Sequence, residues 1–540
     1  MFQPSEHWWR SRNNNCMGAS VREYRWALLV SIFLLAFGSL PIIAGYVSQT
    51  PGQRFIGTFY DQPDYAVHMA MMHYGEQGGW DYQLRFTTEP QPTAYVRLFY
   101  VLLGHLGGWV HLSATILFQI ARLAFGLSAC LSIYRLLVRV FPSVSQRKLA
   151  FILTMLGSGV GWLQVLFAWV PSKVAPVDLW LIDAYPLFSI DLFPHFAATI
   201  AAMAIAITAF LDHSSQPHWK NIVVIACCAI FVQIINPIAF LLADLAMVGI
   251  FAYASWQKSR INIRLAISLS LVAIIQIPLA LYSFILLTQN PTWAIYTHQN
   301  VTPSPPPLYY LLGFAFFWPF ALAGVFKAFQ RHETAPGWAI IWVISAFGLA
   351  YIPFNIQARF LLAITLPLAI LATPSLLEFS RWLSLRIHLG LYTGAVLITA
   401  MASMSTLVLV GTSSLGMTSR PASLFEPAAL VQAVDWLGKN GTPNDVVLAA
   451  EPSALLVAIR TTLRLYSGHA METLNYAEKS QAVQRFYQGG EPAGWLEAQG
   501  ITWVIFGPHE ADWRQTPLDS SGMKIAYHND QVIIYRVSHP

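Results

Sequence analysis

Charge is the scarcest property of this 540-residue sequence, in which Asp, Glu, Lys and Arg together make up only 11%. Soluble globular proteins carry roughly a quarter of their residues as charged side chains, so the scarcity excludes that class. Hydrophobic residues reach 56%, and the mean hydropathy is +0.51. The sequence therefore predicts a polytopic membrane protein whose surroundings are the lipid bilayer.

Cysteines and nucleotide motifs are also few or missing. The four cysteines show no CxxC spacing and no accompanying His cluster, which argues against a disulfide framework and a Cys-based zinc site. The sequence contains no GxGxxG, no GxxxxGK[ST] and no internal repeat, so we expect neither a nucleotide cofactor nor an ATP-driven engine. The net charge of +5 comes from basic residues in short loops, a pattern that indicates membrane topology and no nucleic-acid partner.

Long hydrophobic runs divide the first three quarters of the chain. The run at 26–47 is long enough to span a bilayer and has no small-residue cleavage site, which favours a retained anchor over a cleaved signal. Eleven runs are expected to cross the membrane, near 26–47, 113–140, 149–170, 195–211, 221–236, 237–256, 265–287, 307–329, 337–354, 359–379 and 387–410. Segment 95–112 is also apolar but is interrupted by Arg97, His105 and His111.

Basic loop residues decide between an interfacial and a spanning placement of segment 95–112. If it lies along the interface, sixteen Lys and Arg residues fall on one side of the membrane and five on the other. If it spans, the first basic cluster opposes all later ones, against the positive-inside rule. We therefore expect a cytoplasmic N-terminus, and we expect the first outer loop 48–112, segments 171–194 and 288–306, and the C-terminus to lie outside.

From about residue 420 the composition changes to that of a soluble domain. The segment "PAALVQAVDWLGKNG" predicts an amphipathic helix closed by Gly441, "DVVLAA" and "ITWVIFG" predict buried strands, and "MKIAYHNDQVIIYRV" predicts a hairpin that turns at Asn529 and Asp530. The expected fold class is an all-α polytopic membrane bundle of about eleven transmembrane helices, with interfacial helices in the first outer loop and a C-terminal extracytoplasmic α/β domain. The expected divisions are a cytoplasmic segment 1–25, a transmembrane catalytic domain 26–417 and an extracytoplasmic domain 418–540.

The first outer loop carries the most suggestive acids. "PDYAVHMAMMHYG" predicts a short helix ended by Gly75, with Asp61 and Asp64 near its positive end, where carboxylates are held ionised. Either acid can act as a general base or as a metal ligand, although a capping role for both fits the same pattern. Glu89 lies in "FTTEPQPT", where flanking prolines favour a rigid extended turn suited to cation or hydroxyl binding, and simple solvent exposure remains the alternative.

The second outer loop and the later spans add further candidates. The loop contains Asp178, Asp183 and Asp191, and His195 opens the following span. A carboxylate and an imidazole at this level are suited to a divalent ion or a phosphate, while a hydrogen-bonded interfacial histidine is the alternative. Arg359 begins a late span on the outer side, and Arg122 lies inside the second span. Arginines at such depths are costly unless paired, and an anionic head group is a natural partner; snorkelling is the alternative for Arg359.

Across nearly its whole length the chain resembles the GT-C superfamily of integral-membrane glycosyltransferases, which includes protein O-mannosyltransferases and aminoarabinose transferases. The resemblance rests on "FYDQPDYAVHMA", "TEPQP…YVRLFYVLLGHLG", "FPHF" and "NIQARFLLAITLPLAIL". The segments "RLYSGHAMETLNYAEKSQAVQRFY" and "GITWVIFGPHE" are similar to the outer domain of a poorly characterised bacterial branch.

The resemblance implies a polyprenyl-phosphate sugar as donor, a glycan, lipid or protein as acceptor, and the inner membrane of a bacterium as location. It implies Asp64 as the catalytic base, with Asp61 as the competing assignment. It also implies roles for Glu89, Asp183 and Arg359 at the donor site. Together with His195 and Arg122, whose positions suggest the same role, these residues are expected to bind the donor phosphate or a divalent cation (Mg, Mn or Zn), with Asp61 and Asp183 as metal ligands. In the aminoarabinose branch the acid precedes two adjacent prolines, whereas Gln91 separates Pro90 from Pro92 here.

Two other classes of function stay open at this stage. One is a transporter or flippase of lipid-linked substrates. Two observations argue against it: the acids are expected in outer loops, and the sequence shows no paired inverted halves. The other is a non-catalytic relative whose outer domain binds polymers of the cell envelope.

Overall fold

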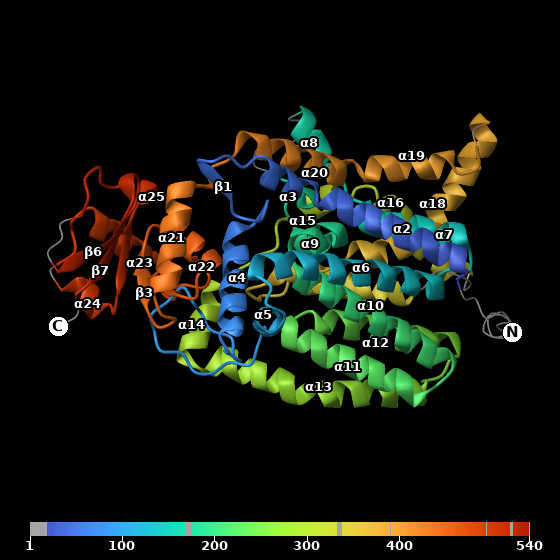
Figure 1. Ribbon diagram of the computed structural model, residues 1–540. Coiled ribbons are helices and arrows are strands. Elements are labelled where there is room, and N and C mark those ends of the chain that lie inside the picture. The colour runs from blue at the N-terminus through green and yellow to red at the C-terminus, as the bar shows by residue number, and fades with distance from the viewer. Residues whose placement is uncertain are drawn as a thin grey trace. The chain divides into compact units, whose positions relative to one another are not determined.

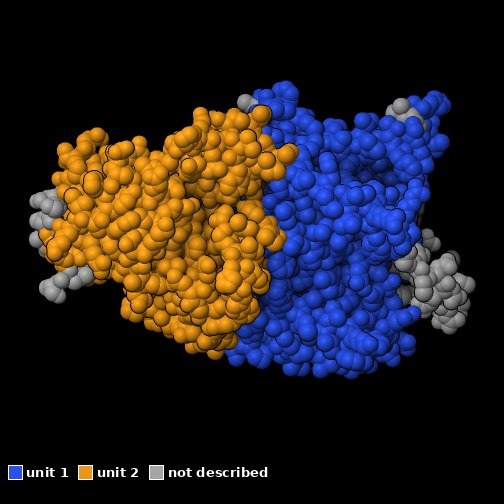
Figure 2. Space-filling view, in the orientation of Figure 1, with its two compact units in different colours: residues 1–39, 121–281, 302–412 blue, residues 40–120, 282–301, 413–540 orange. Residues whose placement is uncertain are grey.

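The computed structural model describes residues 19–167, 175–331, 337–388, 390–492, 494–518 and 522–538. Within these ranges the chain is mostly helical, with one five-stranded and one two-stranded sheet (Figure 1). Two compact units are coloured separately in Figure 2: unit 1 comprises 1–39, 121–281 and 302–412, and unit 2 comprises 40–120, 282–301 and 413–540. The predicted cytoplasmic segment 1–25 lies mostly outside the described residues.

Apolar helices of three kinds account for the hydrophobic runs. Five segments are long enough to cross a bilayer: α6 (Ala114–Val140), α10 (Pro194–Ser215), α12 (Phe240–Gln257), α13 (Ile263–Gln289) and Gln357–Ile387, which joins η3 (Gln357–Leu361) to α18 (Thr365–Ile387). Four broken pairs have the same composition: α2 (Val21–Gly38) with α3 (Leu40–Val47), α7 (Val144–Leu156) with α8 (Gly161–Phe167), α15 (Pro307–Gly313) with α16 (Trp318–Arg331), and α19 (Thr393–Ala402) with α20 (Met404–Gly416). Two shorter apolar helices are α11 (Trp219–Ile235) and α17 (Trp338–Leu349).

Each of the eleven predicted runs corresponds to one of these segments, but the number of spans is not confirmed. The described residues contain five candidate spans, or up to nine if each broken pair is one span. The 17 residues of α11 and the 12 of α17 reach only about 25 and 18 Å as helix, against a hydrocarbon core of about 30 Å. Hydropathy counts apolar residues in turns together with those in helices, so it overestimates the length of a straight span.

The segment that we expected to lie along the interface forms α5 (Phe99–Val110), which with 12 residues is too short to span a bilayer. It packs on α4 (Gln62–Glu76) at two glycines. A Cβ on Gly75 would come within 2.1 Å of the Val101 carbonyl oxygen, and one on Gly104 within 2.1 Å of the Met72 carbonyl oxygen. The prediction that Gly75 ends α4 is therefore wrong: Gly75 lies inside the helix and permits the close approach of α5. The placement of α5 at the membrane surface stays a prediction.

The C-terminal part of unit 2 is an α/β structure, as predicted. Its five strands run in the order β4-β3-β5-β7-β6, with β4, β3 and β5 parallel and β7 and β6 antiparallel. The strands are β3 (Val446–Leu448), β4 (Arg464–Leu465), β5 (Trp503–Phe506), β6 (Met523–His528) and β7 (Ile533–Val537), and the helices are α21 (Ala428–Asn440), α22 (Glu451–Arg460), α23 (Tyr476–Tyr487), α24 (Trp495–Ala498) and α25 (Pro508–Ala511). The predicted hairpin turn is confirmed, because Asn529 Oδ1 accepts the backbone N–H groups of Gln531 and Val532.

Unit 2 also ties the loop at 48–112, the predicted first outer loop, to this C-terminal part. Strand β1 (Gln53–Phe55) pairs antiparallel with β2 (Phe425–Pro427), and α4 packs against α22. Three-residue strands show too little alternation to be found from sequence, so this pairing was not predicted. The remaining elements are η1 (Val177–Leu179), η2 (Ile182–Ala184), α9 (Pro186–Leu192), α14 (Pro291–Gln299) and η4 (Met417–Ser419).

Candidate active site

The N-terminus of α4 presents two half-buried carboxylates. Asp61 is the N-cap residue, in a left-handed conformation with φ of 50°, and its Oδ1 accepts the backbone N–H of Asp64 at 3.5 Å. Asp64 lies in the first helical turn, where the helix dipole stabilises negative charge. The capping role that sequence reasoning left open is thus present for Asp61. A left-handed backbone at a residue other than glycine costs on the order of 1 kcal/mol or more and often marks functional sites.

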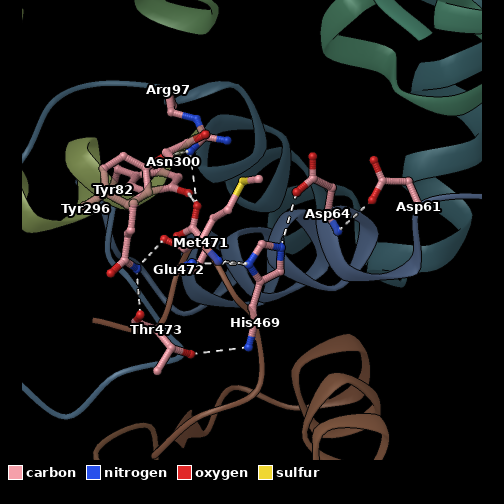
Figure 3. Close-up of polar contacts among 11 residues, drawn as sticks. Asp61, Asp64, Tyr82, Arg97, Tyr296, Asn300, His469, Met471, Glu472 and Thr473 are labelled. Atoms are coloured by element: carbon pink, nitrogen blue, oxygen red, sulfur yellow. Dashed lines mark hydrogen bonds and ion pairs between the residues drawn. The ribbon is translucent and has the colours of Figure 1, made fainter. Parts of the chain in front are cut away.

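His469 from the C-terminal part of unit 2 contacts Asp64 (Figure 3). Its Nε2 lies 3.3 Å from Asp64 Oδ1, and the His469 side chain is only 5% exposed whereas that of Asp64 is 33% exposed. The other ring nitrogen, Nδ1, accepts the backbone N–H groups of Met471 at 3.0 Å and Glu472 at 3.2 Å. Because a nitrogen that accepts these bonds carries no proton, we assign the proton to Nε2, which donates to Asp64.

Charge and hydrogen bonding act on His469 in opposite directions. Burial lowers the pKa of His469, while the carboxylates of Asp64, Glu472 and Asp61 raise it, with a net increase above 6.5. The two amide donors at Nδ1 oppose this increase, because a protonated Nδ1 could accept neither of them. The geometry therefore favours the neutral ring as donor to an ionised Asp64.

The loop that carries His469 is itself firmly held. Gln299, at the end of α14, donates through Nε2 to the carbonyl oxygens of Met471 at 2.9 Å and Thr473 at 2.6 Å. The Thr473 hydroxyl in turn accepts the backbone N–H groups of Gly468 and His469, each at 3.3 Å. Gly468 has φ of 155°, and a Cβ there would lie 2.7 Å from the Ala454 Cβ. These bonds fix the backbone of the loop before and after His469 and thereby the position of its imidazole.

The cation Arg97 pairs with Glu472 on the loop that carries His469. Arg97 Nη1 lies 3.2 Å from Glu472 Oε1, donates also to the Tyr296 hydroxyl, and the guanidinium stands 5.0 Å from the centre of the Tyr82 ring. Arg97 has a left-handed backbone with φ of 53°. Burial by itself lowers the pKa of Arg97, but the surrounding tyrosine and carboxylate groups, Asp64 among them, raise it well above its ordinary value. The side chain stays charged and 27% exposed.

Glu89 is also engaged within unit 2. Its Oε2 lies 2.7 Å from Lys479 Nζ on α23 and accepts the Thr87 hydroxyl. Burial raises the pKa of Glu89, but the hydrogen bonds from Lys479 and Thr87 outweigh burial and lower it below 4.5. Arg464 Nη2 adds a bond to the Thr87 carbonyl oxygen at 2.8 Å. Glu89 therefore joins the first outer loop to the C-terminal part of the unit.

Comparison with known proteins identifies the fold. No protein-family profile matches the sequence, and no curated protein matches it by sequence. By structure the chain is similar to ArnT from Cupriavidus metallidurans bound to undecaprenyl phosphate, with a TM-score of 0.50 and 14% identity over 93% of this chain and 98% of that one. It is similar also to the apo oligosaccharyltransferase of Archaeoglobus fulgidus, with a TM-score of 0.50 and 13% identity over 91% of this chain and 70% of that one. The chain has the GT-C fold.

This finding confirms the GT-C resemblance at the level of the fold. At identities of 13 to 14%, the likeness assigns no role to any residue. The role of each residue must therefore be argued from its own contacts in this chain.

The remaining predicted residues lie in unit 1. Asp183 is in η2, and its carbonyl oxygen accepts the backbone N–H of Ala363 at 2.8 Å, just beyond the 3-10 helix that contains the half-buried Arg359. This brings the backbones of η2 and η3 together. His195 lies in the first turn of the span α10, as expected, with its ring 4.2 Å from that of Phe196.

Arg122, in α6, forms a buried ion pair. Its Nη1 lies 3.7 Å from Asp191 Oδ1, and its Nη2 donates to the Ser39 hydroxyl at 2.9 Å. The side chains of Arg122 and Asp191 are 3% and 4% exposed. A Cβ on Gly38 would fall within 2.2 Å of the Asp191 carboxylate, so glycine is required beside it. These contacts hold α2, α6 and α9 together, and a phosphate-binding role for Arg122 stays a prediction.

The predicted metal ligands Asp61 and Asp183 belong to different units. Among the residues that the structure describes, no group of three or more His, Cys, Asp or Glu side chains is arranged to hold a metal ion. The expectation of a divalent cation therefore stays a prediction.

Sequence reasoning did not single out His469, Glu472 or Lys479, and it counted Arg97 only as a loop charge. His469 and Asp64 are separated by 405 residues, so no local spacing links them. The available signal was the polar run "SGHAMET" between a strand and a helix of a small α/β domain, because such loops often carry functional side chains.

Proposed function

We propose that the protein is a membrane glycosyltransferase that transfers a sugar from a polyprenyl-phosphate-linked donor to an acceptor on the extracytoplasmic side. The observation that carries the proposal is the partly exposed carboxylate of Asp64, which lies at a helix N-terminus and is hydrogen-bonded to His469. The chain that carries it has a fold similar to that of ArnT bound to undecaprenyl phosphate. A carboxylate that is ionised, accessible and hydrogen-bonded on one side is suited to general-base catalysis.

The proposed reaction inverts the anomeric carbon. Asp64 accepts the proton of the acceptor hydroxyl while the hydroxyl oxygen forms a bond to the anomeric carbon. The bond between that carbon and the phosphate oxygen breaks, and the lipid phosphate leaves with the electron pair. General-base assistance of this kind contributes roughly 10²- to 10⁴-fold. Asp61 is the competing assignment for the base.

Cations are needed where charge develops on the leaving phosphate. We propose Arg359 for this role, with Asp183 and His195 as further residues of the donor site. For Glu89 and Arg122, which pair with Lys479 and Asp191, a place in the donor site competes with a purely structural role. A divalent cation is the alternative to Arg359 and, if bound there, would supply the same positive charge. We place the protein in the inner membrane of a bacterium, with its N-terminus in the cytoplasm and residues 418–540 outside.

Reconstitution distinguishes this proposal from its alternatives. The purified protein is placed in liposomes with a radiolabelled polyprenyl-phosphate sugar and an extract of envelope glycans and lipids as acceptors. Transfer of label to an acceptor, lost in the Asp64→Asn variant, supports the enzyme. Movement of the label between leaflets without transfer indicates a flippase. Binding of envelope polymer with neither transfer nor movement indicates a non-catalytic relative.

A further inference from the structure

The loop between β4 and α23 brings a histidine to the proposed base. His469 is 4% exposed, yet its Nε2 reaches Asp64 Oδ1, at the N-terminus of a helix in the first outer loop. Backbone N–H groups hold the ring at Nδ1, and its Nε2 faces the partly exposed carboxylate of Asp64. The backbone contacts at Nδ1 support the loop, whereas the contact at Nε2 acts on Asp64.

The tautomer defines what this ring can do. With Nδ1 occupied by two backbone N–H donors, the ring has no nitrogen left to receive a proton, because Nε2 already carries one. His469 therefore cannot be the base. It can donate one hydrogen bond to Asp64 Oδ1, which restricts rotation of the carboxylate and stabilises its ionised form.

We propose that His469 is a positioning residue for Asp64, so that the C-terminal part of the chain completes the catalytic base contributed by the first outer loop. This inference rests on the proposed glycosyl transfer. The other charged groups facing the pair are Asp61 on α4, Glu472 on the loop of His469 and Arg97 before α5. A substitution at His469 leaves these three side chains in the sequence, so its effect reports on the imidazole donor.

Two substitutions separate positioning from structural support. In His469→Asn, the side-chain oxygen can still accept the Met471 and Glu472 N–H groups, but the side chain is too short to reach Asp64. In His469→Gln, the longer amide can still donate to Asp64 but loses the acceptor at the position of Nδ1. The Asn variant thus keeps the loop and loses the catalytic contact, while the Gln variant does the reverse.

Transfer from a labelled polyprenyl-phosphate sugar is measured for the wild type and both variants in liposomes, together with thermal unfolding. We expect kcat of His469→Asn to fall roughly 10- to 100-fold, the range for a hydrogen bond to a charged group. Its unfolding temperature should match the wild type, and the acid limb of its pH-rate profile should move to higher pH because ionised Asp64 has lost a donor. His469→Gln should stay within about 5-fold of the wild-type kcat, since the donor remains.

A second measurement tests the coupling directly. In an Asp64→Asn background, adding His469→Asn should cause no further loss, since residues that act as a unit are not additive. Wild-type kcat and pH profile in His469→Asn, or equal losses in the Asn and Gln variants, overturn the positioning role while the glycosyltransferase stands. Absence of transfer by the wild type removes the proposed function and the inference with it.

Discussion

Two carboxylates of this chain, each paired with a nitrogen-containing side chain, are in opposite surroundings. The Asp64 side chain is 33% exposed and its partner His469 is neutral, whereas Asp191 and Arg122 are both less than 5% exposed and form an ion pair. An open carboxylate can meet a substrate hydroxyl. A buried pair must offset the cost of removing both charges from water and is weak evidence for function. Accessibility distinguishes the acid suited to chemistry from the acid suited to holding helices.

Neutralising the exposed acid should have the largest effect. Asp64→Asn keeps the size and the helical position but removes the base, so transfer should fall roughly 10²- to 10⁴-fold with unfolding unchanged. Asp61→Asn is the matched control, because Asn is equally good as an N-cap and tolerates the left-handed conformation. A larger loss in Asp61→Asn than in Asp64→Asn, measured by the liposome transfer assay, would move the base assignment to Asp61.

The buried pair should respond in the opposite way. Arg122→Met leaves Asp191 without its cation, and breaking such a pair typically costs about 3–5 kcal/mol, which thermal unfolding in detergent would reveal. The double variant Arg122→Met with Asp191→Asn should recover part of the loss, because no uncompensated charge remains. Activity per folded molecule should change little in both. If transfer is lost in Arg122→Met without loss of stability, Arg122 contacts substrate after all.

The pair of Glu89 and Lys479 combines a partly exposed carboxylate with a buried cation. Substituting Glu89 should have the smallest effect of the three changes. The pKa of Glu89 is lowered, because the bonds from Lys479 and Thr87 outweigh burial. Its contribution to the stability of the folded protein is therefore present above pH 4.5 and is lost as the pH falls through the lower pKa of the folded state. Glu89→Gln should unfold more easily at neutral pH by about 1 kcal/mol or less. Thermal unfolding from neutral to acidic pH should show the difference shrinking below pH 4.5. The exposed Glu478→Gln serves as control and should show no such trend, whereas a loss of transfer at unchanged stability would assign Glu89 to the donor site.

Much of the fold was predictable because its signals are local. Hydrophobic runs located the candidate spans, the broken pairs, α11 and α17 among the described residues, and the patterns after residue 420 located α21, β3, β5 and the β6–β7 hairpin. Breaks such as the one between α15 and α16 were not predictable, because the apolar composition continues through the turn between them. The position of Asp61 and Asp64 at a helix start was readable from Pro63, which lies between them and is tolerated in a first helical turn.

Composition and periodicity were enough to predict a membrane protein with a small α/β part and with acids in the loop that follows its first hydrophobic run. The tertiary structure alone decided that Asp64 receives a hydrogen bond from His469, 405 residues away, and that Arg122 is paired with Asp191, 69 residues away. Partners at such separations meet only when helices and strands pack together. No spacing along the chain records which side chains that packing brings into contact.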